Sequence, residues 1–150
     1  MEERFQTFTI LIAGISRSIR KIKTAEMSEF NLKGPHVSCL YYLYKSGPIT
    51  AKELCDICAE DKANISRSIR HLEENGYLVC HSKTAKRYQS PLLLTEKGCQ
   101  LGKHIADKID RVLENASAGL DEESRAIFYK SLALIHDNLT IICKEYEDEE

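Results

Sequence analysis

Apolar residues recur at helical spacing along most of the chain. Within residues 5–22 they stand three and four positions apart, which predicts a helix of about five turns with one apolar stripe. Spacing of this kind is typical of a seam between two packed helices. A second helix is expected to begin at Pro35 and to stop at Gly47 and Pro48.

The next segment predicts two short helices with a tight connection. Thr50 and Glu53 form a capping box, which marks the start of the first of them. The pattern restarts at residues 60–61, and the second helix is expected to end at Asn75-Gly76, a common glycine stop. The inward positions expected in the first short helix are Leu54, Ile57 and Cys58.

The hydrophobic period changes between residues 77 and 94. Two short apolar runs, residues 77–80 and 90–94, flank a polar and basic stretch, which predicts two strands joined by a charged loop. Pro91 has no N–H to donate, so its strand is expected to be an edge strand or to be bulged there. Thr95 then caps a long helix that ends near Gly119, and Asp121 caps a final helix.

The order of these elements indicates the architecture. Two short helices, the second ending in glycine and leading into a hairpin with a basic tip, form the layout of a winged helix-turn-helix. The expected fold is therefore mainly α with a small β-hairpin wing, flanked by N- and C-terminal helices that carry apolar stripes.

Composition narrows the class of protein. The chain has 150 residues, 43% hydrophobic and 29% charged, which suits one soluble globular domain. No apolar run approaches the roughly 18 residues of a membrane span, and the first thirty residues lack the pattern of a signal peptide. We therefore expect a cytoplasmic protein with no membrane partner.

Charge is distributed unevenly around a net value of −2. Residues 62–88 hold six basic and two acidic side chains, a local charge of +4. Residues 121–150 hold three basic and nine acidic side chains, a local charge of −6. A basic stretch in a mildly acidic chain suits a polyanion site on an otherwise neutral body.

The hexapeptide ISRSIR occurs twice, at residues 15–20 and 65–70, but its flanks differ, so it is not a structural repeat. On a helical wheel the second copy places its two isoleucines inward and both arginines outward. Arginine suits guanine edges, asparagine suits adenine, and Ser66, Ser68 and Lys62 suit phosphate contacts. The candidate DNA contacts, including the basic wing, are Lys62, Ala63, Asn64, Ser66, Arg67, Arg70, Lys83, Lys86 and Arg87.

Two segments carry a resemblance to a known family. They are DKANISRSIRHLEENGYL and, a few residues later, KRYQSPLLLTEKG. Both resemble the recognition helix, wing and following helix start of the MarR family of bacterial transcriptional regulators. The resemblance extends over nearly the whole chain, because the striped terminal helices correspond to that family's dimerisation helices.

The resemblance implies a single MarR-like domain over residues 1–150. It divides into a DNA-binding winged-helix lobe, residues 36–95, and dimerisation helices, residues 1–33 and 96–146. The function it implies is a homodimer on double-stranded operator DNA, which we expect to be a repressor released by a small aromatic or lipophilic effector. Arg17, His36 and Tyr41 correspond to positions near the effector pocket.

The resemblance also identifies Arg87 as the wing-tip arginine of the minor groove. Here the chain departs from the family pattern. The family usually has Asp before that arginine and a second arginine after it, where this chain has Lys86 and Tyr88. Lys86 adds attraction to phosphate, but it does not orient Arg87 as a carboxylate would.

Two other classes of function stay open. One is a winged-helix protein-interaction module that does not bind DNA. The other is a cysteine-based redox-sensing or metal-sensing regulator, for which Cys80-His81 with Cys99 is a candidate cluster. Cys55 and Cys58 form a CxxC inside a predicted helix without further ligands, so we expect no metal, and Cys58 is expected to be a buried apolar residue. We expect no cofactor and no enzymatic activity, because the sequence contains no catalytic motif.

Overall fold

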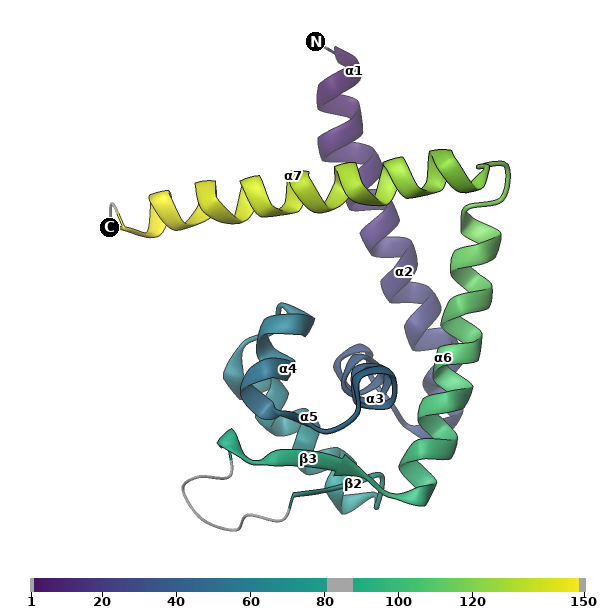
Figure 1. The fold of residues 1–150 in the computed structure, drawn as a ribbon, viewed down its shortest axis with the longest axis vertical. Helices are drawn as coiled ribbons and strands as arrows, with labels where there is room; N and C mark the ends of the chain where they lie inside the picture. The colour runs from purple at the N-terminus through teal and green to yellow at the C-terminus, as the bar shows by residue number, and fades with distance from the viewer. Residues whose placement is uncertain (1, 81–87, 149–150) are drawn as a thin grey trace. The chain divides into compact units, whose positions relative to one another are not determined.

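The computed structural model of the chain describes residues 2–80 and 88–148 (Figure 1). The chain divides into two compact units, residues 1–108 and residues 109–150. The first unit contains the sheet and most of the helices. The second contains the end of α6 (Glu96–Ala116) and all of α7 (Glu122–Asp148). In the part of the chain that the structure describes, no helix is long and apolar enough to cross a bilayer.

The N-terminal region is helical from Glu2 to Phe30. It consists of α1 (Glu2–Phe5), a π-helical segment η1 (Gln6–Leu11), α2 (Ile12–Met27) and a short 3-10 turn η2 (Ser28–Phe30). The sequence predicted one regular helix over residues 5–22, and the helix is both longer and locally wider than that. A spacing of three and four does not distinguish an α-helix from a short π segment, because both keep the apolar residues on one side.

Three helices and a three-stranded sheet form the core of the first unit. The helices are α3 (Gly34–Ser46), α4 (Ala51–Cys58) and α5 (Lys62–Glu74). α3 contacts α4, α5 and β3, and α5 also contacts α4 and β2 (Figure 1). The side chains that this packing removes from solvent include Val37, Leu40, Leu54, Ile65, Leu72, Leu78, Leu92 and Ile105.

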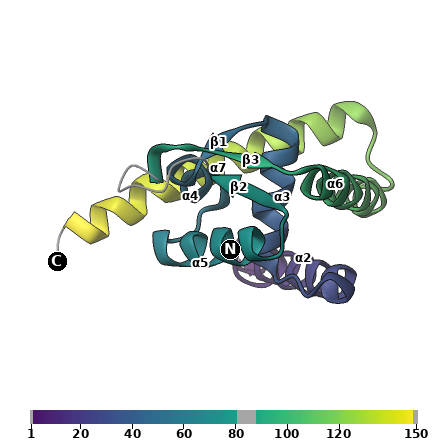
Figure 2. The same cartoon turned by 90° about the horizontal axis from the view of Figure 1, so that it is seen from below.

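The sheet contains one strand more than the sequence predicted. β2 (Leu78–Cys80) and β3 (Pro91–Leu94) pair antiparallel as expected, and β1 (Ile49–Thr50) adds to the other side of β3. The order is β1-β3-β2, and Figure 2 shows the strands side by side. β1 has two residues and leads directly into the cap of α4, so it leaves no alternating pattern.

The prediction for Pro91 was wrong. Its strand is the central one, where an edge strand or a bulge was expected. Pro91 is the first residue of β3 and lies opposite Thr50, the last residue of β1. Proline is compatible with the first position of a strand because the ladder of donated N–H bonds begins after it.

The prediction for Ile57 was also wrong. Leu54 is fully buried as expected, but Ile57 is 43% exposed. About 60° separates these residues on the wheel of α4, and about 40° separates Leu54 from Cys58 in the other direction. The helix therefore buries the side that carries Leu54 and Cys58, and Ile57 lies outside that contact.

Two turn segments, ENGYL and LTEKG, are joined by hydrogen bonds at the start of α6. Thr95 Oγ1 donates to the carbonyl of Gly76 at 2.7 Å and accepts from the N–H of Gly98 at 3.0 Å. The N–H of Thr95 donates to the carbonyl of Tyr77 at 3.1 Å. A Cβ on Gly98 would stand 1.8 Å from that same carbonyl oxygen. Only glycine permits this approach, which fixes the start of α6 to the turn that follows α5.

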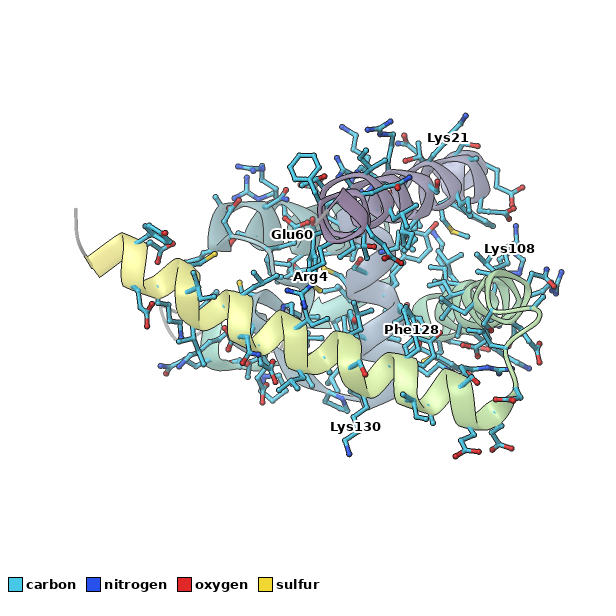
Figure 3. The ribbon with its side chains drawn as sticks, turned by 90° about the horizontal axis from the view of Figure 1, so that it is seen from above. Arg4, Lys21, Glu60, Lys108, Phe128 and Lys130 are labelled. Atoms are coloured by element: carbon cyan, nitrogen blue, oxygen red, sulfur yellow. The ribbon has the colours of Figure 1, made fainter. Side chains whose placement is uncertain are left out.

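The second unit is mainly α7. Asp121 caps it as predicted, accepting from the N–H of Ser124 at 2.7 Å, and this bond lowers the pKa of the Asp121 carboxyl. Figure 3 shows Phe128 and Lys130 on opposite sides of α7. The helix carries large apolar side chains that stay exposed in the isolated chain, namely Phe128, Leu132, Leu139, Ile142 and Tyr146.

Candidate nucleic-acid interface

The first helix of the helix-turn-helix begins with the predicted capping box. The N–H of Glu53 donates to Thr50 Oγ1 at 3.2 Å, and the N–H of Thr50 donates to Glu53 Oε2 at 2.7 Å. The bond from the Thr50 backbone lowers the pKa of the Glu53 carboxyl. These reciprocal bonds satisfy two N–H groups that the start of a helix leaves without helical partners, and they set the direction of α4.

The turn between α4 and α5 is short and specifically closed. Ala59 takes the left-handed conformation, with φ 51° and ψ 44°, and ends α4. Asp61 caps α5 by accepting from the N–H of Asn64 at 2.8 Å. Glu60, labelled in Figure 3, accepts from the side-chain amide of Asn64 at 2.5 Å. These contacts hold the first turn of α5 in a defined position.

The two faces of α5 differ as the helical wheel predicted. Ile65, Ile69 and Leu72 are buried against the core. Lys62, Ala63, Ser66, Arg67 and Arg70 are exposed on the other side. The structure therefore brings these five predicted contacts together on one accessible helical face.

Two polar residues of α5 are engaged inside the protein. Ser68 was predicted to suit a phosphate contact, and this was wrong. Its side chain is 2% exposed, and its hydroxyl donates to the carbonyl of Asn64 at 2.9 Å. Asn64 itself is half-buried, with its amide bonded to Glu60, so a contact with adenine requires that bond to open.

The base of the wing contacts both helices. Tyr88 follows the predicted wing, and its hydroxyl lies 3.2 Å from the sulfur of Cys55 on α4. That interaction raises the pKa of Tyr88 to about 12. The ammonium group of Lys62 on α5 stands 4.6 Å from the centre of the Tyr88 ring, in cation–π contact. The predicted contacts Lys83, Lys86 and Arg87 lie outside the described residues.

A groove of about 400 Å³ runs between α5 and the sheet. Two basic side chains, Lys62 and Arg70, are among its lining residues. Its remaining lining residues are Ala51, Ser66, Ile69, Glu73, Tyr88 and Leu92. The exposed face of α5 and this groove form a continuous surface.

Comparison with known proteins identifies this arrangement. The model of the MarR family matches residues 30–87, which include α3, α4, α5 and β2. The fold resembles that of a putative MarR family transcriptional regulator from Listeria monocytogenes, which was solved in complex with a 26mer DNA. The TM-score is 0.76 and the sequence identity is 26%, and the match covers 85% of each chain. Residues 30–87 therefore match the MarR family, and the chain has the fold of MarR regulators. The same fold appears in NMB1585, a MarR family regulator from Neisseria meningitidis, with a TM-score of 0.80 and 16% identity over 95% of this chain and 97% of that one.

A curated relative agrees with this assignment. The chain is 27% identical over 113 residues to the uncharacterized HTH-type transcriptional regulator YwoH of Bacillus subtilis. The match covers 75% of this chain and 82% of the relative. The comparisons thus indicate a transcriptional regulator.

The MarR resemblance also predicted three residues near an effector pocket, and in the structure each of them has different neighbours. His36 stacks on His71 with ring centres 4.2 Å apart and accepts from the N–H of Lys33 at 3.0 Å. Burial, followed by the charges of His71 and Lys33, lowers the pKa of His36 to about 4. Tyr41 packs edge-on against Tyr42, and Arg17 is exposed on α2. An effector pocket at these residues stays a prediction.

Sequence reasoning missed two parts of this interface, Glu60 and Tyr88. An acid four positions before Asn64 is a weak local signal for the bond that Glu60 makes. The contacts of Tyr88 join residues 26 and 33 positions away and have no such signal. Among the described residues no cluster of His, Cys, Asp or Glu has the arrangement of a metal site, and all six cysteines are present as thiols.

Proposed function

We propose that the protein is a homodimeric, sequence-specific DNA-binding repressor whose affinity for its operator falls when a small aromatic or lipophilic effector binds. The observation that carries this proposal is the exposed face of α5. It presents Arg67 and Arg70 to solvent while the opposite face is buried in the core. A helix held in this way is suited to enter a major groove.

The residue types on this face match the chemistry of base and phosphate recognition. The guanidinium groups of Arg67 and Arg70 suit the O6 and N7 acceptors of guanine. Lys62 and Ser66 suit phosphate oxygens, which fix the position of the helix without reading sequence. Ala63 is small and exposed, which allows the helix to approach the base edges closely. In our proposal Lys83, Lys86 and Arg87 add contacts from the wing.

The comparison with the Listeria regulator supports DNA as the partner. That protein was solved in complex with a 26mer DNA, and it shares the fold of this chain at 26% identity. Operator DNA is located in the bacterial cytoplasm, so the proposed role places the chain there. A winged helix that binds only protein does not require an exposed basic face of this kind.

The exposed apolar residues support a homodimer. Phe5, Phe8, Ile15 and Ile19 of the N-terminal helices are between 42% and 67% exposed in the single chain. Large apolar side chains on α7 are exposed as well. Such surfaces in a soluble protein mark sites of association. Light scattering at twice the mass of one chain is the expected result, and a monomer would contradict the dimer.

The proposal also includes a binding pocket for the effector. We assign its pocket to Arg17, His36 and Tyr41 by their family positions. Titration with simple aromatic acids should weaken operator binding by the wild type, and Tyr41→Ala should reduce that response while leaving effector-free DNA affinity unchanged. Equal responses of the two proteins would remove Tyr41 from the pocket.

The experiment for DNA recognition begins with selection of genomic fragments by the purified protein. Fluorescence anisotropy of a selected duplex should show an affinity that falls steeply with salt, because phosphate contacts release bound cations. Arg67→Ala should cost about 1–3 kcal/mol and relax base preference. Lys86→Ala should weaken all duplexes alike and reduce the salt slope. Affinity that is absent, or independent of salt, would favour the protein-interaction alternative.

A further inference from the structure

The side chain of Tyr88 contacts both helices of the helix-turn-helix. Tyr88 stands shortly before Pro91, the first residue of β3, and is half-buried. Its hydroxyl oxygen lies 3.2 Å from the sulfur of Cys55 on α4. The centre of its ring lies 4.6 Å from the ammonium nitrogen of Lys62 on α5. One ring is therefore held by α4 through its hydroxyl and presents its face to α5.

The position of Lys62 gives this contact a consequence. Lys62 is the first residue of α5, directly after the cap Asp61, and its side chain is exposed. The start of a helix carries a partial positive charge, which repels a cation placed there, whereas the face of an aromatic ring attracts it. An ammonium group has three N–H donors, so it can face the ring and still donate to a phosphate oxygen. The Tyr88 ring thus holds the cation without using up its capacity to bind an anion.

The ring stands beside one particular stripe of α5. Lys62, Ser66 and Arg70 follow one another at intervals of four, so they share one face of the helix. All three line the groove that Tyr88 also lines. Arg67 is exposed on the same helix, but the described residues that line the groove do not include it. Tyr88 is therefore placed to act on Lys62 and not on every basic residue of α5.

We propose that Tyr88 is a positioning residue, whose ring holds the Lys62 ammonium group in place to donate to a DNA phosphate. This inference rests on the proposed function, in which Lys62 contacts phosphate. A lysine side chain in solvent occupies many rotamers, and fixing it in a complex lowers affinity. The ring restricts those rotamers before DNA binds, so less entropy is lost in the complex. The contact with Cys55 keeps the ring at α4, and α4 thereby helps to set the position of a side chain on α5.

A double-mutant cycle on a selected duplex tests this role. Fluorescence anisotropy gives the affinities of the wild type, Lys62→Ala, Tyr88→Leu and the double variant. Tyr88→Leu should weaken binding about three- to tenfold, which corresponds to the cost of ordering one long side chain. In the Lys62→Ala background the same change should weaken binding by less than about twofold, because no ammonium group is left to position. Equal losses in the two backgrounds would overturn the proposal.

Two matched comparisons separate positioning from a general structural role. Tyr88→Phe keeps the ring and lacks only the hydroxyl, so it should bind within about twofold of the wild type. Tyr88→Leu should weaken binding by the same factor with and without Arg67→Ala, because Arg67 lies outside the groove. A loss in Tyr88→Phe as large as that in Tyr88→Leu would show that the ring face is not what matters. Coupling to Arg67 as strong as coupling to Lys62 would show that Tyr88 acts on the whole helix. Either result would overturn the proposal.

Proton NMR of the full chain without DNA tests the contact itself. An aromatic ring shields protons above its face, so the ε-methylene protons of Lys62 should resonate upfield in the wild type and in Tyr88→Phe, but not in Tyr88→Leu. A wild type without this upfield shift would overturn the positioning role. If the wild type binds its duplex and the losses are independent, the proposed function stands and the role of Tyr88 fails. If the upfield shift is present but no duplex is bound, the proposed function fails, and the role of Tyr88 on DNA fails with it.

Discussion

Replacement of Gly98 by alanine tests the interlock between the recognition segment and α6. The added methyl group would stand 1.8 Å from the Tyr77 carbonyl oxygen and 3.2 Å from a methyl group of Leu94. Because real contacts of Cβ essentially never fall below 3.0 Å, α6 and the segment at Tyr77 must separate by about 1.2 Å, the difference between 3.0 and 1.8 Å. The obstructing atom belongs to the backbone, so a change of rotamer does not relieve the clash.

The magnitude follows from two costs. Overpacking at a rigid contact costs about 3 kcal/mol, the upper part of the usual range. Separation also weakens the bonds of Thr95 to Gly76 and Tyr77, at about 1 kcal/mol each. We therefore expect Gly98→Ala to lose about 3 to 5 kcal/mol, a large part of the stability of a domain of this size.

Urea unfolding at one fixed protein concentration measures this loss as a lower midpoint. Gly14→Ala is the matched control, because Gly14 also lies within a helix and a Cβ there meets nothing within 4 Å. That control should gain about 0.5–1 kcal/mol from the higher helix propensity of alanine. Equal midpoints for Gly98→Ala and the wild type would refute the close approach at Tyr77.

Two further predictions concern the helix ends. The pKa of His36 is lowered to about 4 from 6.5, so the fold favours the neutral ring, and stability should fall as the pH drops from about 6.5 to 4. The loss of stability is on the order of 1–2 kcal/mol, because solvent screens the partly exposed ring. The variant His36→Gln keeps an acceptor for the N–H of Lys33 and should flatten the dependence of the unfolding free energy on pH. An unchanged pH profile would contradict the assignment to His36. Asp61→Ala should destabilise the protein by about 1 kcal/mol through loss of the α5 cap, whereas Asp61→Asn should remain close to the wild type in the same urea assay. Equal stability of all three proteins would show that the cap contributes nothing.

The sequence predicted the features that depend on local chemistry. The caps at Thr50 and Asp121 were recognisable because each bond spans only three residues. The outward position of Arg67 and Arg70 was predictable because Ile65 and Ile69 fix the inward side of α5.

Features that depend on tertiary contacts were not predictable in the same way. β1 has two residues, and the residues they pair with lie 43 and 41 positions away, so no alternation identifies it. Pro91 was expected in an edge strand or at a bulge because it has no N–H to donate, and the third strand, which makes β3 central, was not predicted. The inward side of α4 was only partly predicted, because a helix of eight residues carries few apolar positions to define it. The contacts of Tyr88 with Lys62 and Cys55 were not predicted either, because they join residues far apart in the sequence.

The central claim is that the exposed face of α5 reads DNA. The chain provides its own control, because Arg20 holds in the first ISRSIR copy the place that Arg70 holds in the second, and both are exposed on helices. The decisive measurement is the affinity of Arg70→Ala and Arg20→Ala for the selected operator and for a duplex with altered bases. We expect Arg70→Ala to lose about 1–3 kcal/mol on the operator and to discriminate less between the duplexes, while Arg20→Ala matches the wild type. Equal affinity of Arg70→Ala and the wild type for both duplexes would contradict the claim.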